Sequence, residues 1–357
     1  STLFPYTTLF RSPYRFMSKH AAQATAADGR GRWWALIALC LGVLMIALNV
    51  TIVNVALPSI RLDLRFSEAS LVWVVNAYLV TFGGFLILGG RLGDLFGRRR
   101  FFLLGIAFFT LASLGCGIAT SPGLLVAARS GQGLGGAIVS AVALSQIMNL
   151  FTEAPMRAKM LGIYVFVSAG GGSFGLLLGG ILTTALSWHW IFLINVPIGV
   201  GVYALCFALL PHDDRRPTGG HLDVAGAVTA TTSLMLAIYA IVNANQAGWT
   251  SAPTLTLLTS AGILLVLFVG IEARVQTPLI PLELFRIRNL TVASIANVLL
   301  AVAVLAWNFF SALYLQLVLQ FSPLQVGLAF LPANLTIAAM SLDRKSTRLN
   351  SSHPYRS

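Results

Sequence analysis

The chain has 357 residues, of which 57% are hydrophobic and only 10% charged, and its mean hydropathy is +0.83. This composition excludes an ordinary soluble domain, in which about a quarter of the residues are charged. The net charge of +12 does not indicate a nucleic-acid partner, because the basic residues form short clusters between long apolar runs, as in loops between membrane spans. We therefore expect an all-α integral membrane protein whose surroundings are the lipid bilayer.

Nine apolar segments are long enough to cross a bilayer as helices. They cover residues 33–57, 71–90, 101–120, 123–149, 161–186, 190–210, 224–244, 255–271 and 291–315, and a tenth runs from about 324 to 340. The first span is too long for a cleaved signal peptide and is expected to end at Pro58. The three cysteines, Cys40, Cys116 and Cys206, all fall inside these runs, so we read them as packing residues rather than as a disulfide or metal site.

The segments between the spans suggest an order of domains. We expect a cytoplasmic amino terminus (13–32), a six-helix bundle (33–210), a cytoplasmic linker (211–223), two extra central helices (224–271), a cytoplasmic loop (272–290) and the start of a second bundle (291–342). Nearly all the Lys and Arg residues lie on the amino-terminal side of the membrane, whereas the opposite loops hold only Arg61 and Arg65. This asymmetry predicts that the amino terminus is cytoplasmic.

The two ends of the chain differ from the rest. Residues 1–12 and 343–357 resemble translated sequencing-adapter read-through, and we keep them apart from the fold as probable artefactual tails. Under this interpretation the chain is a fragment without its carboxy-terminal part, and we expect little or no transport from it alone. The alternative is that both ends are genuine tails.

Arg129 is the one formally charged residue well inside a predicted span. A charge in hydrocarbon costs roughly 2.5–3.5 kcal/mol on insertion scales, so Arg129 should face a polar cavity or a partner; the alternative is that it reaches the membrane interface. On a helix, Gln132 and Gly136 share its face. The first span carries Asn49, Thr51 and Asn54, which either join helices or line a path. Other spans also contain polar residues: Asn76, Tyr78, Gln146, Asn195, Tyr239, Asn308 and Gln316.

The fifth span places Gly171, Gly175 and Gly179 four residues apart, with Gly180 beside them. Such a face lets another helix approach closely and lets the contact slide or bend. Close packing and a role in conformational change both stay open.

Four motifs in order resemble the major facilitator superfamily, specifically its fourteen-span drug:proton antiporter branch. They are GRLGDLFGRRR (90–100), in a loop between two spans, ARSGQGLGGA (128–137), LNVTIVNVALP (48–58) and WHWIFLINVPIG (188–199). The resemblance implies a rocker-switch exporter with two bundles around a central cavity, no cofactor, and the proton gradient as its energy source. It further implies roles for three groups of residues: a gating loop of Gly90, Asp94, Gly97 and Arg98, proton coupling at Arg129, and an antiporter hinge at Gly171 to Gly180.

The chain departs from the family pattern at three positions. Asn49 stands where the family usually has an Asp, and an amide cannot carry a proton. Leu176 replaces a Pro in the hinge motif, and His189 replaces an Arg.

The expected function is export of hydrophobic or cationic small molecules at a bacterial inner membrane, with accessory export partners unknown. One alternative is a carrier of the same fold that is not coupled to protons through the first helix. Another is a non-transporting sensor or degenerate copy. An enzyme is disfavoured, because no nucleophile with a base and no metal cluster is visible in the spans.

Overall fold

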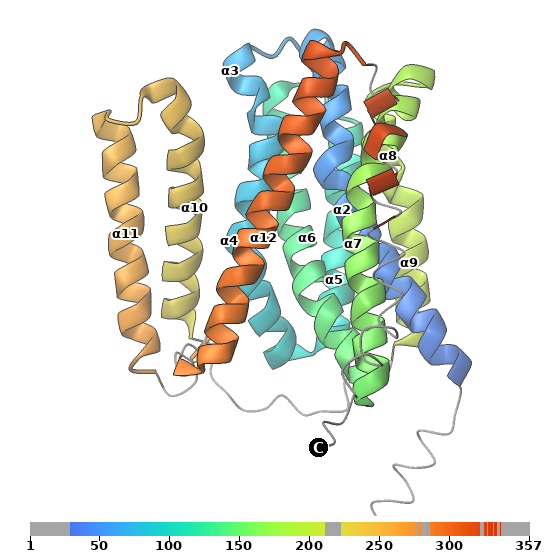
Figure 1. Cartoon of the computed structure of the whole chain (residues 1–357), viewed down its shortest axis with the longest axis vertical. Coiled ribbons are helices and arrows are strands. Elements are labelled where there is room, and N and C mark those ends of the chain that lie inside the picture. The colour runs from blue at the N-terminus through green and yellow to red at the C-terminus, as the bar shows by residue number, and fades with distance from the viewer. Residues whose placement is uncertain are drawn as a thin grey trace, which may run out of the picture.

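The computed structural model describes residues 29–210, 223–275, 278–279, 284, 286–321, 325–326, 328–330, 332–333 and 336. Its helices (Figure 1) are α2 (Gly29–Leu64), α3 (Glu68–Leu71), α4 (Trp73–Phe96), α5 (Arg98–Gly117), α6 (Pro122–Leu150), α7 (Ala154–Ala185), α8 (Trp190–Leu193), α9 (Asn195–Leu209), α10 (Val224–Ala247), α11 (Ala252–Glu272) and α12 (Arg288–Leu313), which continues into a π-helical turn, η2 (Tyr314–Val318). Within the described ranges eight helical segments are long and apolar enough to cross a membrane, with α12 beyond them. The prediction of an all-α membrane protein is confirmed. The linker, both tails and most of the predicted tenth span lie outside the described residues.

Two boundaries predicted from the sequence are wrong. Pro58 does not end the first span, because α2 continues through it to Leu64. A proline removes one backbone hydrogen bond, but apolar side chains beyond it, such as Ile60, remain buried, and their packing keeps the helix going.

The segment 90–100 is not a loop. The helix α4 runs on to Phe96 and α5 starts at Arg98, so Gly97 alone separates them. Gly97 has φ of +108°, a conformation that residues with a side chain rarely adopt, and this lets the chain reverse in a single residue.

The helices α2 to α9 form one bundle. In it α4 packs on α6, α2 on α7, α5 on α6, and α9 against both α2 and α5. The helices α10 and α11 form an antiparallel pair at the side of the bundle next to α4 (Figure 1). The pair is joined by Ser233, whose hydroxyl donates to the carbonyl of Ala261 at 2.8 Å. By contrast, the described side chains of α12 are almost all exposed.

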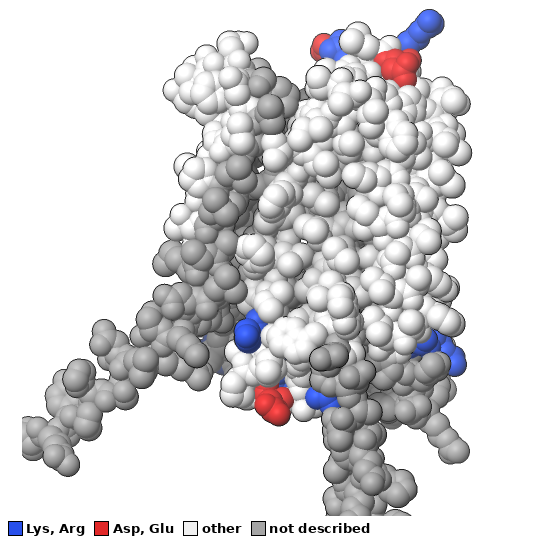
Figure 2. Space-filling model, turned by 90° about the vertical axis from the view of Figure 1, so that its right-hand side faces the viewer, with Lys and Arg blue, Asp and Glu red and all other residues white. Residues whose placement is uncertain are grey.

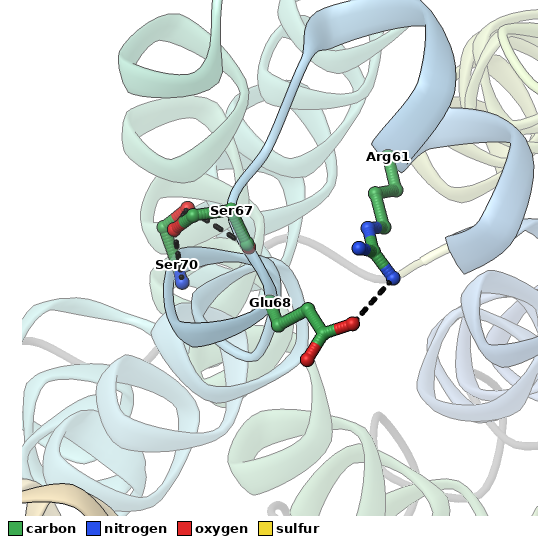
Figure 3. A network of polar contacts seen from close by, with 4 residues as sticks. All are labelled: Arg61, Ser67, Glu68 and Ser70. Atoms are coloured by element: carbon green, nitrogen blue, oxygen red, sulfur yellow. Dashed lines mark hydrogen bonds and ion pairs between the residues drawn. The ribbon is translucent and has the colours of Figure 1, made fainter.

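On the face of the bundle that Figure 2 shows, charged side chains gather at the two ends and leave an uncharged band between them. We call the end where α4 turns into α5 the basic end; it holds Arg91, Arg98, Arg99, Arg100, Arg157 and Lys159. At the opposite end, Arg61 of α2 pairs with Glu68 of α3 at 3.0 Å, beside Ser67, which caps α3 (Figure 3). This division is typical of a protein that spans a bilayer.

Candidate functional site: a buried arginine

Arg129 lies on α6 inside the bundle and is fully buried. Its Nε donates to the carbonyl of Val74 in α4 at 2.8 Å. One terminal nitrogen donates to Oδ1 of Asn49 in α2 at 3.2 Å and to Oε1 of Gln132, one turn along α6, at 2.9 Å. Because the side chain is fully buried and is held by groups from three helices, the alternative in which Arg129 reaches the membrane interface is wrong.

The network extends into α5 through Gln132. The amide nitrogen of Gln132 donates to Oγ of Ser113 at 2.7 Å, and the thiol of Cys116 donates to Oε1 of Gln132 at 3.4 Å. The sequence reasoning missed Ser113 and interpreted Cys116 as packing only. Their spacing of three residues was the one available signal, because it puts both on one face of a helix.

Aromatic rings cover the guanidinium. Its carbon is 4.5 Å from the ring centre of Tyr78 and 5.7 Å from that of Phe192. Gly136 makes room for this arrangement, since a Cβ there would lie 3.2 Å from the hydroxyl of Tyr78. Cation–π contacts of this kind gain strength when water is absent.

No carboxylate pairs with Arg129 among the described residues; its partners are amides and a backbone carbonyl. Its second terminal nitrogen and the hydroxyl of Tyr78 are buried without a hydrogen-bond partner. A guanidinium does not release its proton in proteins, and amides do not carry one. The site therefore holds a fixed positive charge among neutral groups.

The structure separates Thr51 and Asn54 from this network. Thr51 instead donates from Oγ1 to the carbonyl of Gly172 in α7 at 2.7 Å. Asn54 is exposed. Of the predicted path residues, the structure brings together Asn49, Arg129 and Gln132 only.

The predicted hinge glycines lie where α7 crosses α2. A Cβ at Gly171 would be 2.6 Å from Cβ of Ala47, and one at Gly179 would be 2.6 Å from the carbonyl oxygen of Ile52. At Gly175 it would collide with Oγ1 of Thr51 and lie 2.8 Å from the carbonyl of Leu48. These three glycines permit the close approach of the two helices; Gly180 beside them is buried. The helix α7 is continuous through this stretch.

The predicted gating residues lie at the basic end. The guanidinium of Arg98 contacts Oδ1 of Asp94 at 2.8 Å, through both Nε and a terminal nitrogen, across the corner at Gly97. Gly90 lies over Ala141 of α6, at 3.6 Å from its Cβ. The ion pair is partly exposed, so it stabilises this corner only modestly.

No group of three or more His, Cys, Asp or Glu that could hold a metal occurs in the described part of the chain.

Comparison with known proteins places these features in a family. The family model described as Major Facilitator Superfamily matches residues 39–354, a range that reaches into the carboxy-terminal segment 343–357. The cephamycin export protein CmcT of Amycolatopsis lactamdurans is 41% identical over 86% of this chain and 64% of its own length. The puromycin resistance protein pur8 of Streptomyces alboniger is 40% identical over 87% of this chain and 61% of its length.

A multidrug resistance protein of Mycobacterium tuberculosis, Stp, is 36% identical over 86% of this chain and 57% of its length. The chain thus spans about 60% of the length of these three relatives. The resemblance that the sequence motifs indicated is confirmed: this chain belongs to the Major Facilitator Superfamily of membrane transporters.

Proposed function

We propose that this chain belongs to a secondary transporter that exports hydrophobic or cationic small molecules by alternating access. The observation that carries the proposal is the buried Arg129 and its uncharged partners from α2, α4 and α6. A cation is costly to keep inside a membrane protein and usually serves a transport path there. Relatives named for cephamycin export and for puromycin and multidrug resistance support the substrate class.

The second part of the proposal concerns energy and orientation. The proton gradient drives export, and no cofactor takes part. The amino terminus lies in the cytoplasm of a bacterium, and the protein is in its inner membrane; the concentration of Lys and Arg at the basic end supports this orientation. Asp94 and Arg98 then hold one end-state at the cytoplasmic face, and the α2–α7 crossing is where the bundle adjusts as the transporter alternates.

One observation favours a second candidate, a carrier not coupled to protons through its first helix. Asn49 contacts Arg129 at 3.2 Å, so the position that would let a carboxylate share protons with the arginine holds an amide instead. Proton coupling in this candidate depends on parts of the protein outside the described residues.

Everted membrane vesicles test the proposal. Two proteins are compared: this chain alone, and this chain joined to the carboxy-terminal part of CmcT beyond the region of similarity. Alternating access needs both bundles, so energised vesicles should accumulate ethidium with the fusion and not with the chain alone. A protonophore should abolish accumulation, and Arg129→Ala should reduce it at least about tenfold.

The controls separate three outcomes. A folded fusion that never moves ethidium or puromycin contradicts transport and favours the sensor. Accumulation that survives the protonophore contradicts proton-driven export by any route. Accumulation unchanged by Arg129→Ala contradicts the role given to the arginine.

A further inference from the structure

An exposed apolar stripe runs along roughly the first half of α2. Trp34, Ile37 and Leu41 are 56%, 43% and 36% exposed, and Leu44 and Leu48 continue the stripe half-buried. The spacing of three and four residues keeps all five side chains on one face of the helix. Both α7 and α9 pack against α2, and the stripe lies open along them.

Two shallow grooves flank the stripe. One, of about 280 Å³, lies between α2 and α9 and is lined by Leu41, Leu44 and Leu48 with Pro197, Ile198 and Leu205. The other, of about 250 Å³, lies between α2 and α7 and is lined by the same Leu44 and Leu48 with Phe174 and Leu177. Because they share Leu44 and Leu48, the grooves form one continuous apolar surface.

At the basic end this surface meets two cations. Nζ of Lys159 lies 5.9 Å from the ring centre of Trp33, whose ring is 6.0 Å from that of Phe151. Nε of Arg157 donates to the carbonyl of the same Phe151 at 2.8 Å. Both cationic side chains are exposed, and neither forms an ion pair with a carboxylate in the described residues.

We propose that this apolar surface and the two cations at its basic end, which together we call the flank, form a specific site for one anionic phospholipid. Its phosphate lies at Lys159 and Arg157, and an acyl chain lies along the α2 stripe. The rise from Trp33 to Leu48 is about 22 Å at 1.5 Å per residue, which matches one leaflet of a bilayer about 40–45 Å thick with its headgroups.

The composition of the flank selects this ligand. A soluble anion would neutralise the charge of the two cations but would leave the apolar grooves empty. A zwitterionic lipid would fill the grooves but would neutralise less of the positive charge. Trp33 is 41% exposed and lies where amphipathic rings favour the headgroup level. The site is independent of whether the protein transports anything.

Native mass spectrometry of the full chain in detergent tests the site, with dioleoyl phosphatidylglycerol and dioleoyl phosphatidylcholine added in equal amounts. We expect one tightly retained phosphatidylglycerol and a preference of about twenty-five-fold over phosphatidylcholine, because each of the two cations near the headgroup contributes about fivefold. Lys159→Gln breaks no hydrogen bond of the structure and should lower the preference about fivefold. Lys159→Arg should keep it, and so should Arg61→Gln, which removes a charge at the opposite end.

The groove is tested separately with Leu44→Trp, which fills it. This variant should release both lipids while leaving the charges unchanged. Inorganic phosphate at millimolar concentration should not displace phosphatidylglycerol. The proposal is overturned if both lipids bind equally, if Lys159→Gln keeps the preference, or if phosphate competes as well as lipid does.

Discussion

Two helix crossings in the bundle use the same contact but enclose different chemistry. Where α4 crosses α6, Thr81 donates to the carbonyl of Ser130 at 2.9 Å and faces Gly133. Where α2 crosses α7, Thr51 donates to the carbonyl of Gly172 at 2.7 Å and faces Gly175. A threonine hydroxyl set against a glycine brings two helices close and satisfies the polar group in an apolar setting.

The difference lies four residues before each glycine. On α6 that position is Arg129, and on α7 it is Gly171. One crossing therefore holds a buried charge, and the other is made of small residues that let the two helices approach closely. The comparison teaches that the same threonine–glycine contact can join two helices whether the neighbouring residue is a charged arginine or a glycine.

Arg129→Ala should have the largest effect on stability. It removes the guanidinium donor from the carbonyl of Val74, from Oδ1 of Asn49 and from Oε1 of Gln132, which keeps only the thiol of Cys116, and it opens a cavity beside Tyr78. We expect a loss of about 3 kcal/mol in the free energy of unfolding, measured by denaturant titration in micelles. Arg129→Met keeps much of the volume and should lose less. Equal stability of wild type and Arg129→Ala would show that the network stabilises nothing.

Gly175→Ala tests whether the crossing of α2 and α7 depends on the close approach of the two helices. The added methyl meets Thr51 and the backbone of α2, and overpacking of this kind costs about 1–3 kcal/mol. Gly133→Ala should behave alike at the first crossing. Gly170→Ala is the matched control, because nothing lies within 4 Å of a Cβ there. If thermal unfolding midpoints show the same change for Gly170→Ala and Gly175→Ala, close packing does not explain these glycines.

Asn49→Asp should stabilise the crossing that holds Arg129, whereas the substitutions above destabilise the protein. A carboxylate 3.2 Å from the guanidinium turns a hydrogen bond between a cation and a neutral amide into an ion pair, which we expect to raise the free energy of unfolding by about 1 kcal/mol. The same substitution in the Arg129→Ala background should instead destabilise, because the new charge is buried alone. A gain of equal size in both backgrounds would contradict the contact.

Thr51→Val and Thr81→Val should have the smallest effects. Each keeps its shape and loses one interhelical hydrogen bond, of about 0.6 kcal/mol in membrane proteins. The two values should agree within error, since the contacts are alike. A loss several times larger at one threonine would show that the crossings are not equivalent.

The sequence predicted most of the fold because apolar length is a strong signal. It also predicted that Arg129 needs a partner, from the cost of its charge. It could not predict that Pro58 lies within a helix, or that Gly97 alone makes a corner, because packing decides the first and a single backbone conformation decides the second. Ser113 escaped notice because a small hydroxyl barely changes hydropathy, and its role depends on which helix faces α5.

The central claim is that uncharged groups hold the buried guanidinium, with Asn49 as a direct partner. A double-mutant cycle of Asn49→Ala and Arg129→Ala, read as the free energy of unfolding in micelles, tests it most directly. We predict that the double variant loses less than the sum of the single losses, by about 1 kcal/mol. Strict additivity within error would contradict the claim, because it would mean that Asn49 and Arg129 do not interact.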